Sequence, residues 1–191
     1  MGQAKARTAS LTQWRALLDP SEQIVFDVAF RTYERFVKPR AATGMCYRMA
    51  FFLTAYLAER HGLRVDPVVG FVNDGTDDLM ISHAWIELGG KKTDISLTIT
   101  GQANIPGPLL ILDREVTRGL ATYTYHRERG AVAEMIEQEF LANPRGREVV
   151  IHKRSEHAQM MAIAADTSSI VPYLNAAPDG LGYRQIAAVI G

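Results

Sequence analysis

Three residues in the first half of this chain are of the types used together in nucleophilic catalysis: Cys46, His83 and Asp94. Cys46 is the only cysteine, and it opens an apolar run with helical spacing. A thiol in the first turn of a helix faces unpaired backbone N–H groups and the positive end of the helix dipole, which favour the nucleophilic thiolate. Cys46 is therefore a candidate nucleophile. The alternative is that an unpaired cysteine on an apolar helix is a small buried hydrophobic side chain.

The helix that carries Cys46 is predicted to lie between Thr43 and Gly62. Thr43 has the side chain of an N-cap, and Gly62 is typical of the residue that follows a helix, with Arg60 and His61 in the last turn. This leaves roughly 18 residues, or about 27 Å of helix. Its apolar stripe consists of Cys46, Met49, Ala50, Leu53 and Leu57. Few polar residues lie on the other sides, so we expect a central, largely buried helix.

His83 and Asp94 belong to a predicted β-hairpin of residues 79–88 and 91–98, joined by Gly89-Gly90. A two-residue turn predicts the cross-strand pairs Leu88–Lys91, Glu87–Lys92, Trp85–Asp94 and His83–Ser96. His83 and Asp94 then become diagonal neighbours on one face, where a carboxylate can orient an imidazole base. The other face is apolar and holds Ala84, Ile86, Leu88, Ile95 and Leu97. The alternative is that the polar face is an ordinary solvent-facing side with a Glu87–Lys92 ion pair.

Three segments in this order resemble the transglutaminase-like branch of the papain-like cysteine enzymes. They are Gly44-Met45-Cys46-Tyr47 at the helix start, His83-Ala84-Trp85-Ile86-Glu87 on one strand, and Thr93-Asp94-Ile95-Ser96 on the next. The resemblance covers residues 38–98. Family members often carry a Trp shortly before the Asp and a Pro after it, whereas this chain has Lys91-Lys92-Thr93 and Ile95 there.

The resemblance implies acyl transfer through a thioester. Cys46 would attack a carbonyl, His83 would act as general base and then as general acid, and Asp94 would fix the imidazole tautomer. The backbone N–H of Cys46 would help to hold the oxyanion, with Arg40 or Thr43 as candidates for a second donor. The substrate would be a peptide, amide or acyl compound, without a cofactor or a metal ion.

The acyl acceptor distinguishes the possible enzymes. Water as acceptor gives a peptidase or amidase, which we favour, and an amine gives cross-linking or acetyl transfer. Two other functions stay open: a catalytically silent transglutaminase-like module for binding or structure, and a toxin-like deamidase of a host protein.

Other side chains are weaker candidates for this chemistry. Asp113, Glu87 and Asn104 lack the diagonal geometry, and His126, His152 and His157 lack a partnering motif, so these three histidines are expected to be surface or core residues. The acidic segment 73–78 lacks the ligand spacing of an EF-hand and is predicted to be a turn.

Length and composition fit one α+β domain spanning residues 1–191. Its expected core is papain-like or transglutaminase-like, with the buried Cys46 helix packed on an antiparallel sheet of residues 63–72, 79–88 and 91–98. The core motifs lie within 38–98, and residues 99–191 would complete the sheet and its covering helices, chiefly through 130–165.

Charge and hydropathy restrict the partners. The 21 basic and 21 acidic residues cancel, which argues against nucleic acid and anionic membranes as partners. No stretch approaches the ~18 apolar residues of a membrane span. A lone cysteine makes a reducing compartment the default, so we expect a soluble, cytoplasmic protein of unknown oligomeric state.

The remaining elements follow from local signals. Predicted helices are 10–18, 20–37, 128–141, 155–165 and 185–190. Predicted short strands are 109–112 and 122–125, with a β-rich run at 148–152. Residues 1–9 are expected to be frayed, and 38–43 and 101–108 to be loops.

Overall fold

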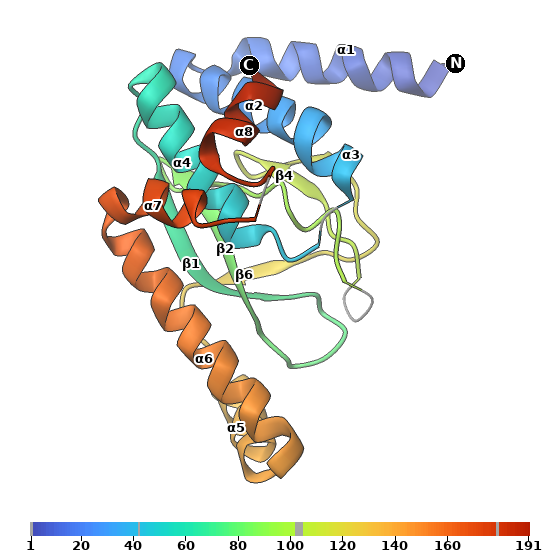
Figure 1. Ribbon diagram of the computed structural model, residues 1–191. Helices are drawn as coiled ribbons and strands as arrows, with labels where there is room; N and C mark the ends of the chain where they lie inside the picture. The colour runs from blue at the N-terminus through green and yellow to red at the C-terminus, as the bar shows by residue number, and fades with distance from the viewer. Residues whose placement is uncertain (1, 42, 102–104, 179) are drawn as a thin grey trace.

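The structure, a computed structural model, describes residues 2–41, 43–101, 105–178 and 180–191; Asn104 and the middle of the predicted 101–108 loop lie outside this part. The chain is an α+β protein, as predicted (Figure 1). The helices are α1 (Gly2–Leu17), α2 (Pro20–Thr32), α3 (Lys38–Arg40), α4 (Cys46–His61), α5 (Ala131–Ala142), α6 (Pro144–Ala165), α7 (Ile170–Asn175) and α8 (Tyr183–Ile190). The π-helical turn η1 (Tyr33–Val37) joins α2 to α3, and the 3-10 turn η2 (Thr167–Ser169) joins α6 to α7.

The strands form an antiparallel sheet and a small ribbon. The sheet has the order β3-β2-β1-β6, and the ribbon pairs β4 with β5. Their bounds are β1 (Asp66–Asn73), β2 (Ile81–Leu88), β3 (Lys91–Thr93), β4 (Leu109–Ile111), β5 (Arg114–Thr117) and β6 (Thr124–His126). The three predicted strands of the sheet are present, each shorter than expected, and β5 was not predicted.

The hairpin register is confirmed close to the turn and wrong beyond it. Glu87 pairs with Lys92 and Leu88 with Lys91, as the two-residue turn predicts. β3 ends at Thr93, however, so the predicted pairs of Asp94 with Trp85 and of Ser96 with His83 do not form. In this register the backbone N–H and C=O of Asp94 point away from β2, and they bond instead with those of Leu110, at 2.8 and 3.0 Å.

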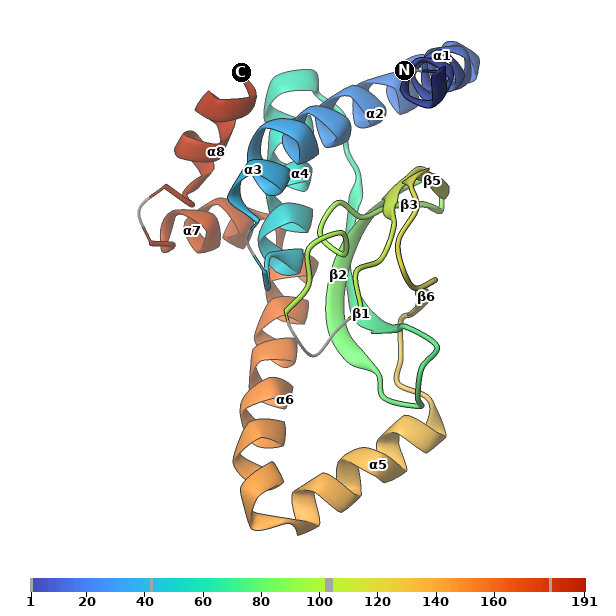
Figure 2. The same ribbon diagram turned by 90° about the vertical axis from the view of Figure 1, so that its right-hand side faces the viewer.

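Helix α4 is buried in the centre of the protein, as predicted. It packs on β2 and β1 and is surrounded on its other sides by α2 and α7 (Figure 2). It ends at Gly62, which has a left-handed φ of 62°. The prediction that Thr43 caps the helix is wrong, because Gly44 turns the chain with a φ of 68° and the helix starts only after Met45.

The apolar face of the hairpin packs on α4. Ala84, Ile86 and Ile95 are buried in the core cluster that α4 dominates, and Leu88 packs against it. Leu97 was predicted to join them but lies instead in a small separate cluster with Val72 and Tyr123. The early end of β3 explains this difference, since strand alternation no longer applies after Thr93.

The second helix runs longer than predicted. Its start is confirmed: Asp19 and Glu22 form a capping box, with Pro20 in the first turn. Pro39 was expected to stop it, but helical structure continues through η1 and α3 to Ala41, which has a φ of 47°. Pro39 follows a π-helical turn in which the N–H of Lys38 bonds to the carbonyl of Tyr33, so its missing N–H falls where the α-helical pattern is already interrupted.

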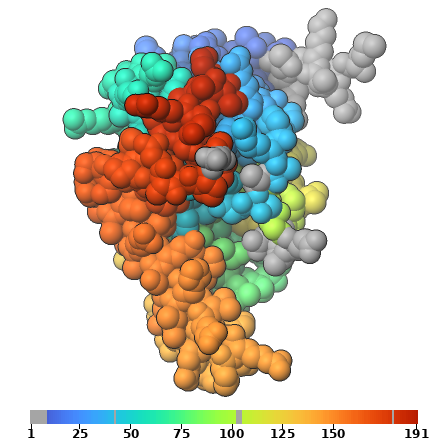
Figure 3. Space-filling view, viewed as in Figure 1, coloured from blue at the N-terminus to red at the C-terminus, as the bar shows by residue number. Residues whose placement is uncertain are grey.

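Helices α5 and α6 form a hairpin that projects from the rest of the molecule (Figures 1 and 3). The prediction of a β-rich run at 148–152 is wrong, because these residues lie inside α6. The side chain of Asn143 caps α6, and Pro144 begins that helix. Residues 130–165 do cover the sheet, through Met160 and Ile163, but α6 lies along β1 on the face that α4 also covers.

Candidate active site

Cys46 is the first residue of α4 and is half-buried. Among the described residues no side chain caps this helix, so the first N–H groups are not used by a side-chain acceptor. The thiol borders a pocket of about 550 Å³, which we call the Cys46 pocket. Its walls are the start of α4 (44–47), the ends of β1 and β2 with residues 79–80, the segment 96–101, and the α5–α6 hairpin.

His83 lies beside Cys46 and lines the same pocket. Its Nε2 is 2.6 Å from Oδ2 of Asp94, so the predicted contact between these two residues is confirmed. The Cys46 side chain is close enough to the imidazole to help raise the pKa of His83. Because Asp94 occupies Nε2, Nδ1 is the ring nitrogen left to exchange a proton with the sulfur.

His83 lies on β2 next to the stretch that the short β3 strand leaves without a partner on that edge. On β2, alternation directs Ala84 and Ile86 toward α4, so His83 begins on the opposite face. β3 ends at Thr93 and pairs only with residues 86–88, so it leaves β2 unpaired beside His83. Cys46, at the start of α4, and His83 border the same pocket. His83 is only 4% exposed, so the solvent-face alternative is wrong.

Charge balance around His83 favours its protonated form. Burial lowers the pKa of His83, but the Asp94 carboxylate and the Cys46 side chain outweigh this effect and raise it to about 10. The same pairing lowers the pKa of Asp94: burial would raise it, but His83 and the hydrogen bonds from Ser96 are stronger. The site is therefore built to hold an imidazolium next to a carboxylate.

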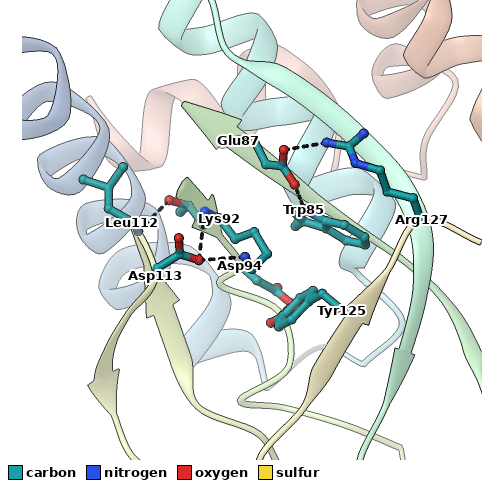
Figure 4. Close-up of polar contacts among 9 residues, drawn as sticks. Trp85, Glu87, Lys92, Asp94, Leu112, Asp113, Tyr125 and Arg127 are labelled. Carbon is teal, nitrogen blue, oxygen red and sulfur yellow. Dashed lines mark hydrogen bonds and ion pairs between the residues drawn. The ribbon is translucent and has the colours of Figure 1, made fainter. Parts of the chain in front are cut away.

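Asp94 is held by more contacts than the sequence indicated. The backbone N–H and the hydroxyl of Ser96 donate to Oδ1, at 2.9 and 2.7 Å. The hydroxyl of Tyr125 donates to Oδ2, at 3.0 Å, and Figure 4 shows the two side chains together. Together with its two backbone bonds to Leu110, these contacts hold the carboxylate in one orientation toward His83.

Tyr125 is a site residue that sequence reasoning missed. It is on β6, where it pairs with Val72 of β1, so it reaches the His83 face of the sheet from two strands away. Burial and the nearby Asp94 carboxylate raise the pKa of Tyr125, which keeps it a hydrogen-bond donor. The pairing of β6 with β1 joins segments about fifty residues apart. Local sequence patterns do not predict such a pairing, so the position of Tyr125 could not be inferred from them.

Figure 4 shows Trp85 and Glu87 with Arg127, in the neighbourhood of Asp94 and Tyr125. The indole N–H of Trp85 donates to Glu87, at 2.8 Å, and Arg127 binds the other oxygen of Glu87, at 2.6 Å. The Trp85 ring packs edge-on against Tyr125, with centroids 5.2 Å apart. The Glu87–Lys92 ion pair considered as an alternative does not form, since Glu87 is engaged by Arg127.

A second polar cluster lines the Cys46 pocket. The hydroxyl of Tyr47 is 2.6 Å from Oγ of Ser82, which is hydrogen-bonded in turn to Nδ1 of His157. His157 stacks on Phe71, with centroids 4.5 Å apart. His157 has no partnering motif in the sequence, but the fold places it half-buried on the pocket wall beside Ser82. The cluster connects α4, β2 and α6 along one wall of the pocket.

The remaining candidates lie away from Cys46. Arg40 covers the ring of Phe36, at 4.1 Å, and neither Arg40 nor Thr43 lines the pocket. Asp113 pairs with Lys92, at 3.0 Å. His126 bonds Thr124, and His152 is exposed on α6.

In the described part of the chain, no group of three or more His, Cys, Asp or Glu side chains is placed to hold a metal ion. Over the same residues, no helix combines the length and apolarity needed to cross a membrane. No family model, curated protein or solved structure matches this chain.

Proposed function

We propose that this protein is a cysteine-dependent acyl-transfer enzyme of the transglutaminase-like, papain-like type. One observation supports this above all: Cys46 and His83 share a pocket, and Asp94 holds the far side of the imidazole at 2.6 Å. Cys46 is the nucleophile, His83 the general base and acid, and Asp94 the residue that orients His83.

The mechanism follows from these positions. The Cys46 sulfur attacks the carbonyl carbon, and the oxyanion accepts a hydrogen bond from a free N–H at the start of α4. His83 gives its proton to the leaving group as the carbon–leaving group bond breaks and a thioester forms. His83 then takes a proton from water, and the attack of that water releases the acid and restores the thiol. Hydrolysis of a peptide or amide is favoured over transfer to an amine.

Activity-based labelling tests this proposal. A panel of electrophilic acyl probes should label the native protein, and the label should disappear in Cys46→Ala. His83→Ala should lose most of the labelling, whereas His126→Ala, which changes a half-buried histidine on β6 that does not line the Cys46 pocket, should label like the parent. A folded protein that no probe labels would leave the silent binding or structural module as the function.

A further inference from the structure

The Cys46 pocket extends well beyond the reacting groups. Cys46 and His83 border it together with the start of α4, whereas Ala133, Phe140 and Val150 border it from the α5–α6 hairpin. Figure 2 shows α5 and α6 diverging beside the tip of the β1–β2 hairpin. The volume of about 550 Å³ is typical of pockets that enclose a drug-sized ligand and far exceeds the needs of an acetyl group.

The lining of the distal part is apolar and incompletely covered. Phe140 and Val149 border the pocket, yet they are 47% and 60% exposed. Exposed apolar side chains that gather around a concave site mark a surface that a ligand covers. Between them and Cys46, the wall continues with Met80 and Ile99.

The charged side chains of the pocket already have partners. Glu137 binds both Arg129 and Arg154, and Lys153 binds Glu156 at 2.7 Å. These five are the Asp, Glu, Lys and Arg residues that line the pocket in the described part of the chain, and the His83 imidazole is paired with Asp94. Because these groups already have partners of opposite charge, a charged ligand group would gain less from them, whereas an apolar group gains by displacing water from apolar side chains.

We infer that the pocket binds an apolar acyl group longer than acetyl, with its carbonyl carbon at Cys46 and its chain directed toward Val150. This inference rests on the proposed function, because the acyl group becomes the thioester. In the reaction, the Cys46 Sγ–carbon bond forms, the carbon–oxygen bond of an ester substrate breaks, and the alcohol leaves with a proton from His83. Water then cleaves the thioester to the free carboxylic acid.

Chain-length dependence tests the inference. With p-nitrophenyl acetate, butyrate, hexanoate and octanoate, kcat/KM should rise by up to about 15-fold for each two methylene groups buried. Val150→Asp places a charge in the apolar wall and should reduce the octanoate-to-acetate ratio at least tenfold. Ile151→Asp is the matched control: the next residue of α6 is 55% exposed and does not line the pocket, so the ratio should not change.

A binding measurement separates this inference from the proposed function. By calorimetry, octanamide should bind Cys46→Ala more tightly than acetamide, and adding Val150→Asp should remove the difference. Ester hydrolysis that depends on Cys46 but not on chain length would overturn the inference and leave the enzyme. Octanamide binding without Cys46-dependent hydrolysis of any ester would support the pocket and overturn the enzyme. Equal binding of both amides would overturn the inference in either case.

Discussion

Asp94→Asn removes one negative charge from a buried site while nearly preserving the shape of the side chain. In the native protein, burial lowers the pKa of His83, but Asp94 and Cys46 raise it to about 10. Without the carboxylate, burial is opposed by fewer charges, so the pKa of His83 should fall toward or below its ordinary value of about 6.5. Near neutral pH, His83 should then be largely uncharged.

The consequence is measured at the Cys46 sulfur. An ordinary thiol with a pKa of about 8.5 is only about 1% thiolate at pH 6.5. If the His83 imidazolium maintains the thiolate in the native protein, His83→Ala should slow alkylation at pH 6.5 by up to about 100-fold. Asp94→Asn should slow it by less, about tenfold, because the imidazole remains and is still partly protonated at that pH.

Iodoacetamide labelling, followed by intact mass from pH 5.5 to 9.5, provides the assay, and the single cysteine makes the product unambiguous. Glu87→Gln is the matched control, because Glu87 is on the same strand and binds Trp85 and Arg127 but has no contact with His83. Equal rates at pH 6.5 for the native protein, His83→Ala and Asp94→Asn would refute the reasoning. So would slow labelling at every pH until denaturant is added, as expected of a buried hydrophobic cysteine.

Three further predictions concern stability. Tyr125→Phe removes a donor to Asp94 and should lower the free energy of unfolding by about 1.5–3 kcal/mol in urea titrations; an unchanged midpoint would contradict this. Gly70→Ala should cost about 1–3 kcal/mol in the same assay, because its Cβ would collide with the backbone oxygen of His126 and lie 2.8 Å from the Trp85 ring. Folding raises the pKa of His83 and lowers that of Asp94. The contribution of this pair to the free energy of unfolding should therefore be largest between about pH 4 and 6.5. It should decline as the pH rises toward 10, and Asp94→Asn should flatten that decline in Tm; parallel curves would argue against the coupling.

The contact between His83 and Asp94 could be predicted because it depends on local signals. Gly89-Gly90 sets the register of the hairpin, and the pairs next to the turn form as predicted. The side chains meet even though the ladder ends one residue before Asp94. On the side away from β2, the backbone of Asp94 bonds to Leu110, and that pairing depends on the path of the connection between the two residues. Local patterns carry no information about such a pairing.

Local sequence patterns also failed to predict where α4 begins. Thr43 has the chemistry of an N-cap, but Gly44 adopts a left-handed conformation and delays the helix until Cys46. Glycine adopts both left-handed and right-handed conformations readily, so its presence in the sequence does not show which one it takes. The delay matters for the proposed chemistry, because it makes Cys46 the first helical residue and leaves the adjacent N–H groups without a side-chain acceptor.

The error in residues 148–152 has a different cause and bears on the pocket. Val149, Val150 and Ile151 favour a strand by propensity, yet Asn143 and Pro144 start a helix that continues through them. The propensity cost of β-branched residues in a helix is only a few tenths of a kcal/mol each, so a good cap and the packing of the far end of α6 outweigh it. Burial of Val149 does not offset this cost, because the side chain remains 60% exposed. Local preference and fold tend to conflict where a surface serves a function, and Val149 and Val150 line the pocket inferred to bind the acyl chain.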